Sequence, residues 1–355
     1  MNSAAPGFAA APGFAGIPGL PQPRPMREWH GLTPGTLPEE LLNGTEPVLL
    51  RGLVRDWPMV QAAHRGPHEA MAYLRSGWGP APVGILLAPP EARGRFFYDE
   101  AMTGLNFKRE TGPLHVVLDA LRQIENDPAP PAIYVGSTSV DQVLPGFRAQ
   151  NDLALGGRDP LVSLWLGNRS RIAAHFDQPD NIACVVAGRR RFTLFPPDQV
   201  ANLYIGPWDL TPAGQAVSLV DFHAPDLERF PRFAQALAHA QVADMEAGDA
   251  VFIPSLWWHQ VEGLTSFNVL VNYWWRRSPA YLDSPVGALM AALLTIRDLP
   301  PEQRRLWRQL FDHYVFEADD QTAAHIPAHA RSALAPLSEA GARQLRKTLV
   351  DRFTR

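Results

Sequence analysis

Hydrophobic and polar positions divide this chain into three stretches with different periodicity. In the first, PVLLRGLVRDWP (47–58) predicts a buried strand and a turn, and residues 67–77 and 113–126 have the spacing of amphipathic helices. From residue 161, short β-rich runs bounded by Gly, Pro and Asp predict a series of strands: LVSLWLG, NIACVVAG, RRFTLFPP, DAVFIPS and FNVLVNYWW. After WWRRSP, apolar residues recur at i, i+3, i+4 and i+7, which predicts a helical tail.

This order of elements indicates a fold class. Many short strands flanked by helices predict a mainly β protein with a double-stranded β-helix core, the jelly roll of cupins, preceded by α/β elements. The barrel core would cover about residues 161–277, and a C-terminal helical region residues 281–355. Gly188 lies between two β-rich runs, and we expect a tight hairpin there. Residues 1–25 contain APGFA twice and several prolines, and they predict a disordered, low-complexity tail.

Composition removes several functional classes from consideration. No uninterrupted apolar run of 18 residues occurs, so no membrane span is expected. A net charge of −4 and a pI of about 6.3 give no basic footprint for a nucleic-acid partner. The single cysteine, Cys184, excludes an internal disulfide and suits a reducing cytosol, so we expect a cytoplasmic protein.

A short polar segment within an apolar stretch contains the first candidate metal ligands. In AAHFDQPDNI (173–182), His175 and Asp177 would point to the same face of a strand. GDAVFIPSLWWHQVEG offers a third candidate, His259, at the end of the next short strand. Two histidines and one carboxylate on one side of a metal leave three positions open, as in non-haem Fe(II) oxygenases. The alternative for His175 and Asp177 is a hydrogen-bonded pair at a strand end.

The stretch from about 161 to 277 resembles the JmjC (cupin-8) 2-oxoglutarate-dependent oxygenases. Within that family it is most similar to the asparaginyl hydroxylase that acts on hypoxia-inducible factor and to its bacterial relatives. The matching motifs are AAHFDQPDN, GRRRFTLFPPDQ, DFHAPDLERFPRF, GDAVFIPSLWWHQVE and NVLVNYWW, with weaker agreement upstream in EPVLLRGLVRDWP. Residues 26–280 would then be the catalytic domain.

The resemblance also implies roles for single residues. It implies that Fe(II) is bound by His175, Asp177 and His259, and that 2-oxoglutarate is held by Tyr134, Asn181, Arg190 and Asn272. Tyr134 would bond the distal carboxylate of 2-oxoglutarate. Arg190 stands where the asparaginyl hydroxylase carries a lysine for the same carboxylate, and a guanidinium can bind a carboxylate through two parallel hydrogen bonds. Ile172 stands where the family often supplies a hydroxyl group.

The expected function is therefore an Fe(II)-, 2-oxoglutarate- and O₂-dependent dioxygenase that hydroxylates a C–H bond. The resemblance favours a protein side chain as the acceptor. Two alternatives stay open: a small-molecule hydroxylase, and a metal-binding cupin module without catalysis. N-methyl demethylation uses the same iron chemistry and also stays open.

The helical tail predicts an oligomer. Its first apolar stripe contains Val286, Leu289, Met290 and Leu293, and its second contains Leu306, Trp307, Leu310, Phe311 and Tyr314. Pro300 and Pro301 separate the two helices. The asparaginyl hydroxylase also ends in helices that interlock across a two-fold axis, so we expect a homodimer. The alternative is that both stripes pack on the barrel of their own chain.

Overall fold

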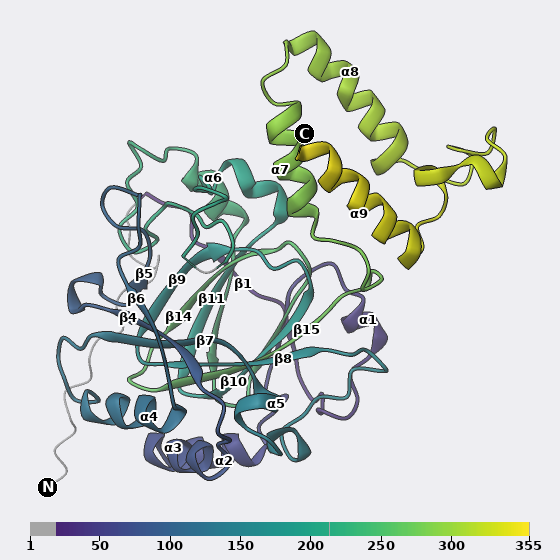
Figure 1. The fold of residues 1–355 in the computed structure, drawn as a ribbon. Coiled ribbons are helices and arrows are strands. Elements are labelled where there is room, and N and C mark those ends of the chain that lie inside the picture. Colours follow the sequence, from purple (N-terminus) through teal and green to yellow (C-terminus); the bar gives the residue numbers. More distant parts are fainter. Residues whose placement is uncertain (1–18, 213, 355) are drawn as a thin grey trace, which may run out of the picture. The chain divides into compact units, whose positions relative to one another are not determined.

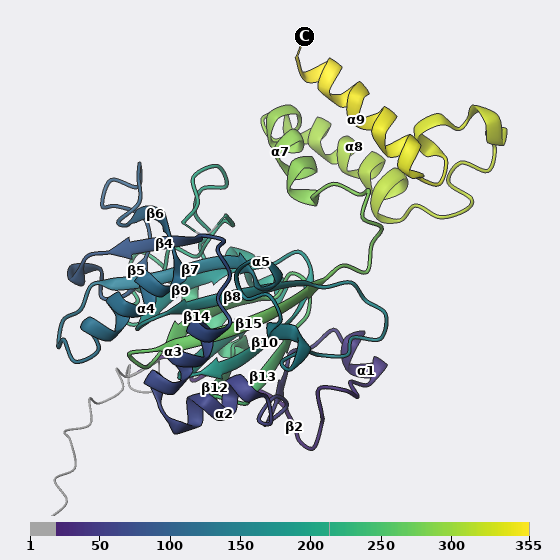
Figure 2. The same cartoon turned by 60° about the horizontal axis from the view of Figure 1, so that its bottom comes forward.

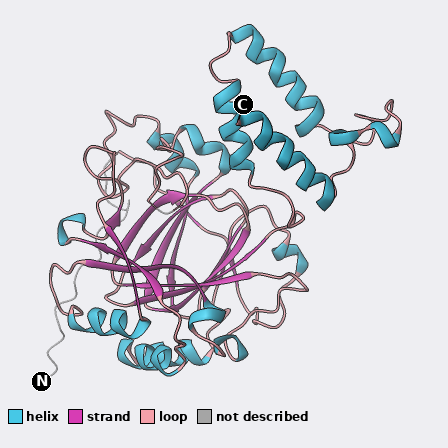
Figure 3. Ribbon diagram, in the orientation of Figure 1, coloured by secondary structure: helices cyan, strands magenta, loops and turns pink. Residues whose placement is uncertain are grey.

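Two β-sheets form the larger of the two units of this protein (Figures 1 and 3). The computed structural model describes residues 19–212 and 214–354, and it divides the chain into a unit ending at Trp275 and a second unit beginning at Arg276. The tail predicted for residues 1–25 lies mostly outside the described residues. Within its last part, Leu20 is buried and Arg24–Pro25 pair with a strand, so ordered structure begins before residue 25.

The sheets have six and nine strands among the described residues. The first has the order β1 (Arg24–Pro25), β12 (Gln241–Glu246), β11 (Arg189–Phe195), β14 (Trp258–Gly263), β9 (Ser170–His175), β5 (Arg95–Phe96). The second, which can be followed in Figure 2, has the order β2 (Glu28–Trp29), β3 (Val48–Leu50), β13 (Ala250–Ile253), β10 (Asp180–Ala187), β15 (Asn268–Trp275), β8 (Leu161–Gly167), β7 (Ala132–Ser139), β4 (Val83–Ala88), β6 (Lys108–Gly112). The predicted mainly β, cupin-like fold is confirmed, as two sheets without a closed barrel.

Helices accompany the sheets at their outer faces. In the larger unit they are α1 (Glu39–Leu42), α2 (Pro58–Arg65), α3 (Pro67–Ser76), α4 (Leu114–Gln123), α5 (Val140–Val143) and α6 (Phe233–His239). Apolar side chains of α2, α3 and α4 share one buried cluster with the nine-stranded sheet, for example Leu74 and Leu118 with Val135. On the six-stranded sheet, Phe195 packs with Phe233 of α6. Each sheet therefore has a covered outer face, and their inner faces are left to form a pocket between them.

The connection at Gly188 is not the tight hairpin that the sequence predicts. β10 and β11, which Gly188 joins, belong to different sheets, so the chain crosses from one sheet to the other at this point. Gly188 has a φ of 76°, and a Cβ atom there would collide with the carbonyl oxygen of Phe267 and with polar atoms of Thr265 and Asn268. A two-residue hairpin requires a residue with a left-handed φ, and the crossing at Gly188 has one as well, so the glycine alone does not distinguish the two connections.

The C-terminal unit is helical, as predicted. It contains α7 (Pro285–Thr295), α8 (Pro301–Phe311) and α9 (Glu339–Phe353), and a π-helical turn, Asp312–Phe316, follows α8. Within the unit, the hydroxyl of Tyr281 donates to the carbonyl of Leu337 at 2.6 Å, and Arg346 pairs with Asp283 at 3.0 Å. No helix in the described part of the chain has both the length and the apolar character needed to cross a membrane.

Candidate metal centre and its pocket

Strand register brings the two candidate histidines together. His175 is the last residue of β9, His259 is the second residue of β14, and the two lie directly opposite each other in the antiparallel pair β9–β14. His259 therefore begins a strand instead of ending one, because a turn that includes Leu256 (φ 66°) separates it from β13. Asp177 lies beyond the end of β9, and its backbone carbonyl accepts a hydrogen bond from the backbone N–H of Leu256 at 2.9 Å. The turn thus holds the loop that carries the carboxylate.

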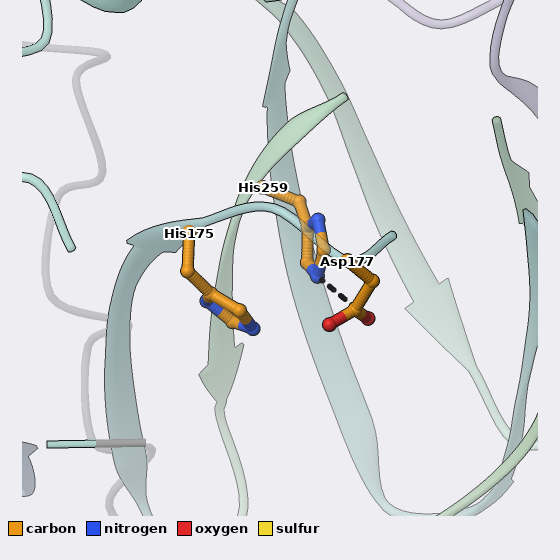
Figure 4. Close-up of side chains that lie close together, drawn as sticks. All are labelled: His175, Asp177 and His259. Atoms are coloured by element: carbon orange, nitrogen blue, oxygen red, sulfur yellow. Dashed lines mark ion pairs between the residues drawn. The ribbon is translucent and has the colours of Figure 1, made fainter. Parts of the chain in front are cut away.

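The three side chains converge on one point (Figure 4). One ligand atom from each of His175, Asp177 and His259 lies within 4.8 Å of the other two. His259 Nε2 lies 3.7 Å from Asp177 Oδ2, and the two imidazole rings have centroids 4.4 Å apart. Separations of this size leave room for one ion between the ligand atoms. A hydrogen-bonded pair of His175 and Asp177 alone, the alternative reading of the sequence, is not what the structure contains.

Hydrogen bonds orient both imidazoles for metal binding. The Nδ1 atom of His175 lies 2.9 Å from the carbonyl oxygen of Ala173, and Nδ1 of His259 lies 3.0 Å from that of Trp257. With Nδ1–H donating to these carbonyls, the lone pair of each Nε2 atom faces the third ligand. Burial, reinforced by the nearby His175, lowers the pKa of His259 to about 4. His259 is therefore neutral at physiological pH, the form that binds a metal.

A cavity of about 660 Å³ opens beside the three ligands. Of the residues named from the sequence, His175, Asp177, His259, Tyr134, Asn181 and Asn272 line it. The amide of Asn272 donates to the Oδ1 atom of Asn181 at 2.9 Å, while its own Oδ1 atom is buried without a hydrogen-bond partner among the described residues. Ile172 also lines the cavity, so its side chain presents carbon where a hydroxyl group would donate.

Arg190 is the most unusual side chain at this site. It is 0% exposed and is not among the residues that line the cavity, and among the described residues no carboxylate pairs with its guanidinium, whose polar neighbour is the Tyr134 hydroxyl. Burial lowers the pKa of Arg190, and the neighbouring Tyr134 hydroxyl, which does line the cavity, opposes that effect. An unpaired buried cation is strongly unfavourable unless an anion joins it. The site is thus built for a carboxylate or a similar anion next to Tyr134.

Sequence reasoning missed one contact at the centre. The indole N–H of Trp274 donates to Asp177 Oδ2 at 3.1 Å. Trp274 belongs to a run of aromatic residues in β15, where the alternation of a buried strand gives no sign that one indole reaches the carboxylate of the loop between β9 and β10. The pairing of β10 with β15, which brings the loop before β10 close to Trp274, shows it.

Comparisons with known proteins give the family. The profile of the cupin-like domain matches residues 34–281. The chain is 34% identical to the lysine-specific demethylase JMJ31 of Arabidopsis thaliana over 35% of its own length and 23% of that protein. It is 33% identical to tRNA wybutosine-synthesizing protein 5 of Mus musculus over 41% of its length and 45% of that protein.

A third relative is matched over more of its length. The bifunctional peptidase and (3S)-lysyl hydroxylase JMJD7 of Homo sapiens is 27% identical over 64% of this chain and 77% of that protein. The chain spans less than half of the length of the demethylase and of the wybutosine-synthesizing protein. The profile covers well over half of the chain, in the region that holds the two sheets and the His–Asp–His centre. The chain therefore belongs to the cupin-like, JmjC-type family that its motifs resemble.

Proposed function

We propose that this protein is an Fe(II)- and 2-oxoglutarate-dependent dioxygenase that hydroxylates a C–H bond. The observation that carries the proposal is the convergence of His175, Asp177 and His259 at the wall of a cavity of about 660 Å³, which is also lined by Tyr134, the neighbour of the buried Arg190 guanidinium. The donor set suits a divalent iron ion, because two neutral imidazoles and a carboxylate leave coordination positions open. The unpaired guanidinium suits the distal carboxylate of 2-oxoglutarate. A cupin that only stores a metal would not require a buried guanidinium without an anionic partner.

Each group of residues has a distinct task in this proposal. Bound iron with 2-oxoglutarate and O₂ would supply the oxidising chemistry, in which one oxygen atom enters the acceptor C–H bond and the other enters succinate, with release of CO₂. His175, Asp177 and His259 hold the ion. Arg190 and Tyr134 bind the distal carboxylate, and Asn181 and Asn272 flank the cosubstrate. The cavity keeps the reacting C–H bond in place and limits the access of water.

The outer part of the cavity favours a polypeptide acceptor. Gly84 of β4 and Gly136 of β7 line it, and the register Ile85↔Val135 places them opposite each other. Nothing lies within 4 Å of a Cβ atom built on Gly84, and only one atom of Trp165, at 4.0 Å, meets that of Gly136. Glycine within a strand often marks a place where another backbone comes close. We infer that this side-chain-free strip receives the backbone of a peptide whose side chain points toward the metal.

The relatives are consistent with a protein acceptor without fixing it. The names of two of them specify lysine or lysyl residues, and that of another specifies tRNA. Because the chain has a net charge of −4, we propose a protein or peptide acceptor and no nucleic-acid or membrane partner. We also propose a cytoplasmic location, from the single buried cysteine, and a homodimer formed through residues 281–355.

Removing a histidine of the centre tests the proposed activity. His175→Ala and His259→Ala are expected to lose stoichiometric Fe(II) or Mn(II) and, with it, succinate formation from 2-oxoglutarate. His239→Ala is the matched control, because this exposed histidine on α6 lies away from the cavity and bonds the carbonyl of Gln235 in its own helix. Elemental analysis and a succinate assay provide the readouts, and the 16 Da mass gain of a peptide library or a metabolite mixture identifies the acceptor class. Unchanged metal content in both variants would overturn the assignment of the centre.

A further inference from the structure

Asp177 is the one candidate ligand that no strand holds. It follows the last residue of β9, and its side chain is 17% exposed. Its backbone is tied to the turn before β14, but an aspartate side chain can still rotate about two bonds. Among the described residues, the only hydrogen bond to its carboxylate comes from the indole N–H of Trp274, which donates to Oδ2 at 3.1 Å.

The indole that makes this bond is itself fixed. Trp274 lies on β15, where it is opposite Asn181 of β10 on one side and Leu161 of β8 on the other. Its ring packs edge-on against Trp165, with centroids 5.8 Å apart and an interplanar angle of 88°. Trp165 in turn packs against Tyr134 at 5.9 Å. A rigid aromatic row of the nine-stranded sheet therefore ends at the Asp177 carboxylate, in the loop between β9 and β10.

We propose that Trp274 is a positioning residue, which holds the Asp177 carboxylate in the orientation that binds the metal. The inference rests on the proposed Fe(II) centre. The Oδ2 atom that accepts the indole N–H is also the atom that lies 3.7 Å from His259 Nε2. Trp274 thus determines which way both carboxylate oxygens face at the centre. Such outer partners of metal ligands typically contribute a factor of about 10–100 to metal affinity.

The test replaces Trp274 by phenylalanine, which removes the indole N–H group and keeps an aromatic ring at this position. Trp274→Phe is expected to bind Mn(II) about 10–100-fold more weakly than the wild type in calorimetric titrations of the metal-free protein. The visible absorption spectrum of the Co(II)-loaded variant is expected to change, because the coordinating carboxylate is released from its fixed orientation. A role in packing alone would alter the melting temperature and leave both readouts as they are.

Trp275→Phe is the matched control. Trp275 is the next residue of β15, it does not line the cavity, and its indole nitrogen is buried without a hydrogen-bond partner among the described residues. Its replacement is expected to leave the Mn(II) affinity and the Co(II) spectrum unchanged. If Trp274→Phe does not fold, Trp274→Leu removes the same donor and is measured in its place.

The outcomes separate this inference from the proposed function. A wild-type protein that binds neither Mn(II) nor Co(II) overturns both. A wild-type protein that binds them, together with a folded Trp274→Phe variant of equal Mn(II) affinity and identical Co(II) spectrum, overturns only the positioning role of Trp274.

Discussion

At the scale of single residues, the unpaired guanidinium of Arg190 makes a quantitative prediction. Removing one partner of a buried ion pair costs about 3–5 kcal/mol, which corresponds to roughly 150- to 5,000-fold in affinity. Arg190→Ala is therefore expected to weaken binding of 2-oxoglutarate to the Mn(II)-loaded protein by about that factor. Tyr134→Phe, which removes one neutral hydroxyl group, is expected to weaken it much less. Arg190→Lys should keep part of the affinity, because the charge remains.

Calorimetric titration with 2-oxoglutarate measures these affinities. Arg191→Ala provides the control, because Arg191 is the next residue of β11 and pairs with Asp244 at 2.7 Å. If the affinity of Arg190→Ala equals that of the wild type, the distal carboxylate is bound elsewhere.

Residue types and their order were enough to predict most of the candidate site. The motifs around His175, Asp177 and His259 indicated a metal centre, and the structure brings these three side chains together. The spacing argument behind the prediction was only partly right, since β9 ends at His175 and Asp177 reaches the centre from a loop. The contact of Trp274 could not be predicted, because it depends on the pairing of β15 with β10, far apart in the chain, and not on local sequence.

At the scale of elements, the strip formed by Gly84 and Gly136 predicts that acceptor binding can be blocked without affecting the binding of metal or 2-oxoglutarate. Gly84→Leu is expected to lower acceptor hydroxylation at least tenfold, because the new side chain fills the outer part of the cavity, where the acceptor backbone would lie. Affinities for Mn(II) and 2-oxoglutarate should stay the same. The variant should also fold, since Gly84 does not have a left-handed φ and nothing lies within 4 Å of the new Cβ atom.

Gly35→Leu is the control for this experiment. Gly35 likewise has open space around its Cβ position and no left-handed φ, and it does not line the cavity. The rate of the 16 Da mass gain on a peptide that the wild type hydroxylates is the readout. Equal rates for Gly84→Leu and wild type would show that the acceptor approaches from another side.

Strands and helices with strong periodicity were predicted well. The connections between strands, and therefore the pairing of the strands, were predicted less well. Runs such as LVSLWLG and NIACVVAG are strands in the structure, as their β-branched and aromatic content indicates. The partner of each strand was not predictable, and for this reason Gly188 was assigned to a hairpin although it joins two sheets. Strand pairing in a jelly roll links residues far apart in the chain, and local sequence patterns do not indicate which strands pair.

At the scale of the whole molecule, the C-terminal unit predicts self-association. Leu306 is 60% exposed, and Trp307 and Leu310 are 44% and 45% exposed. The helices of this unit do not cover these apolar side chains themselves, and a second copy of the same helices would bury them. Light scattering at micromolar concentration is therefore expected to give about twice the chain mass of 39.2 kDa.

Leu310→Arg is expected to shift the protein toward the monomer without changing its metal content. Gln309→Arg, one residue earlier on α8, adds the same charge at an exposed polar position and should leave the dimer intact. A wild-type mass near 39.2 kDa would contradict the dimer.

The direct pairing of His259 with His175 across β9 and β14 has a consequence for thermodynamic linkage. The two imidazoles face one ion only while this strand pair exists, so the ion binds the native chain and not the unfolded ensemble. Each ligand that binds in this way raises the free energy of unfolding, by about 2.7 kcal/mol at a free concentration 100 times its dissociation constant. Thermal denaturation in the presence of different ions and 2-oxo acids can therefore rank the natural ligands of the centre before any acceptor is known.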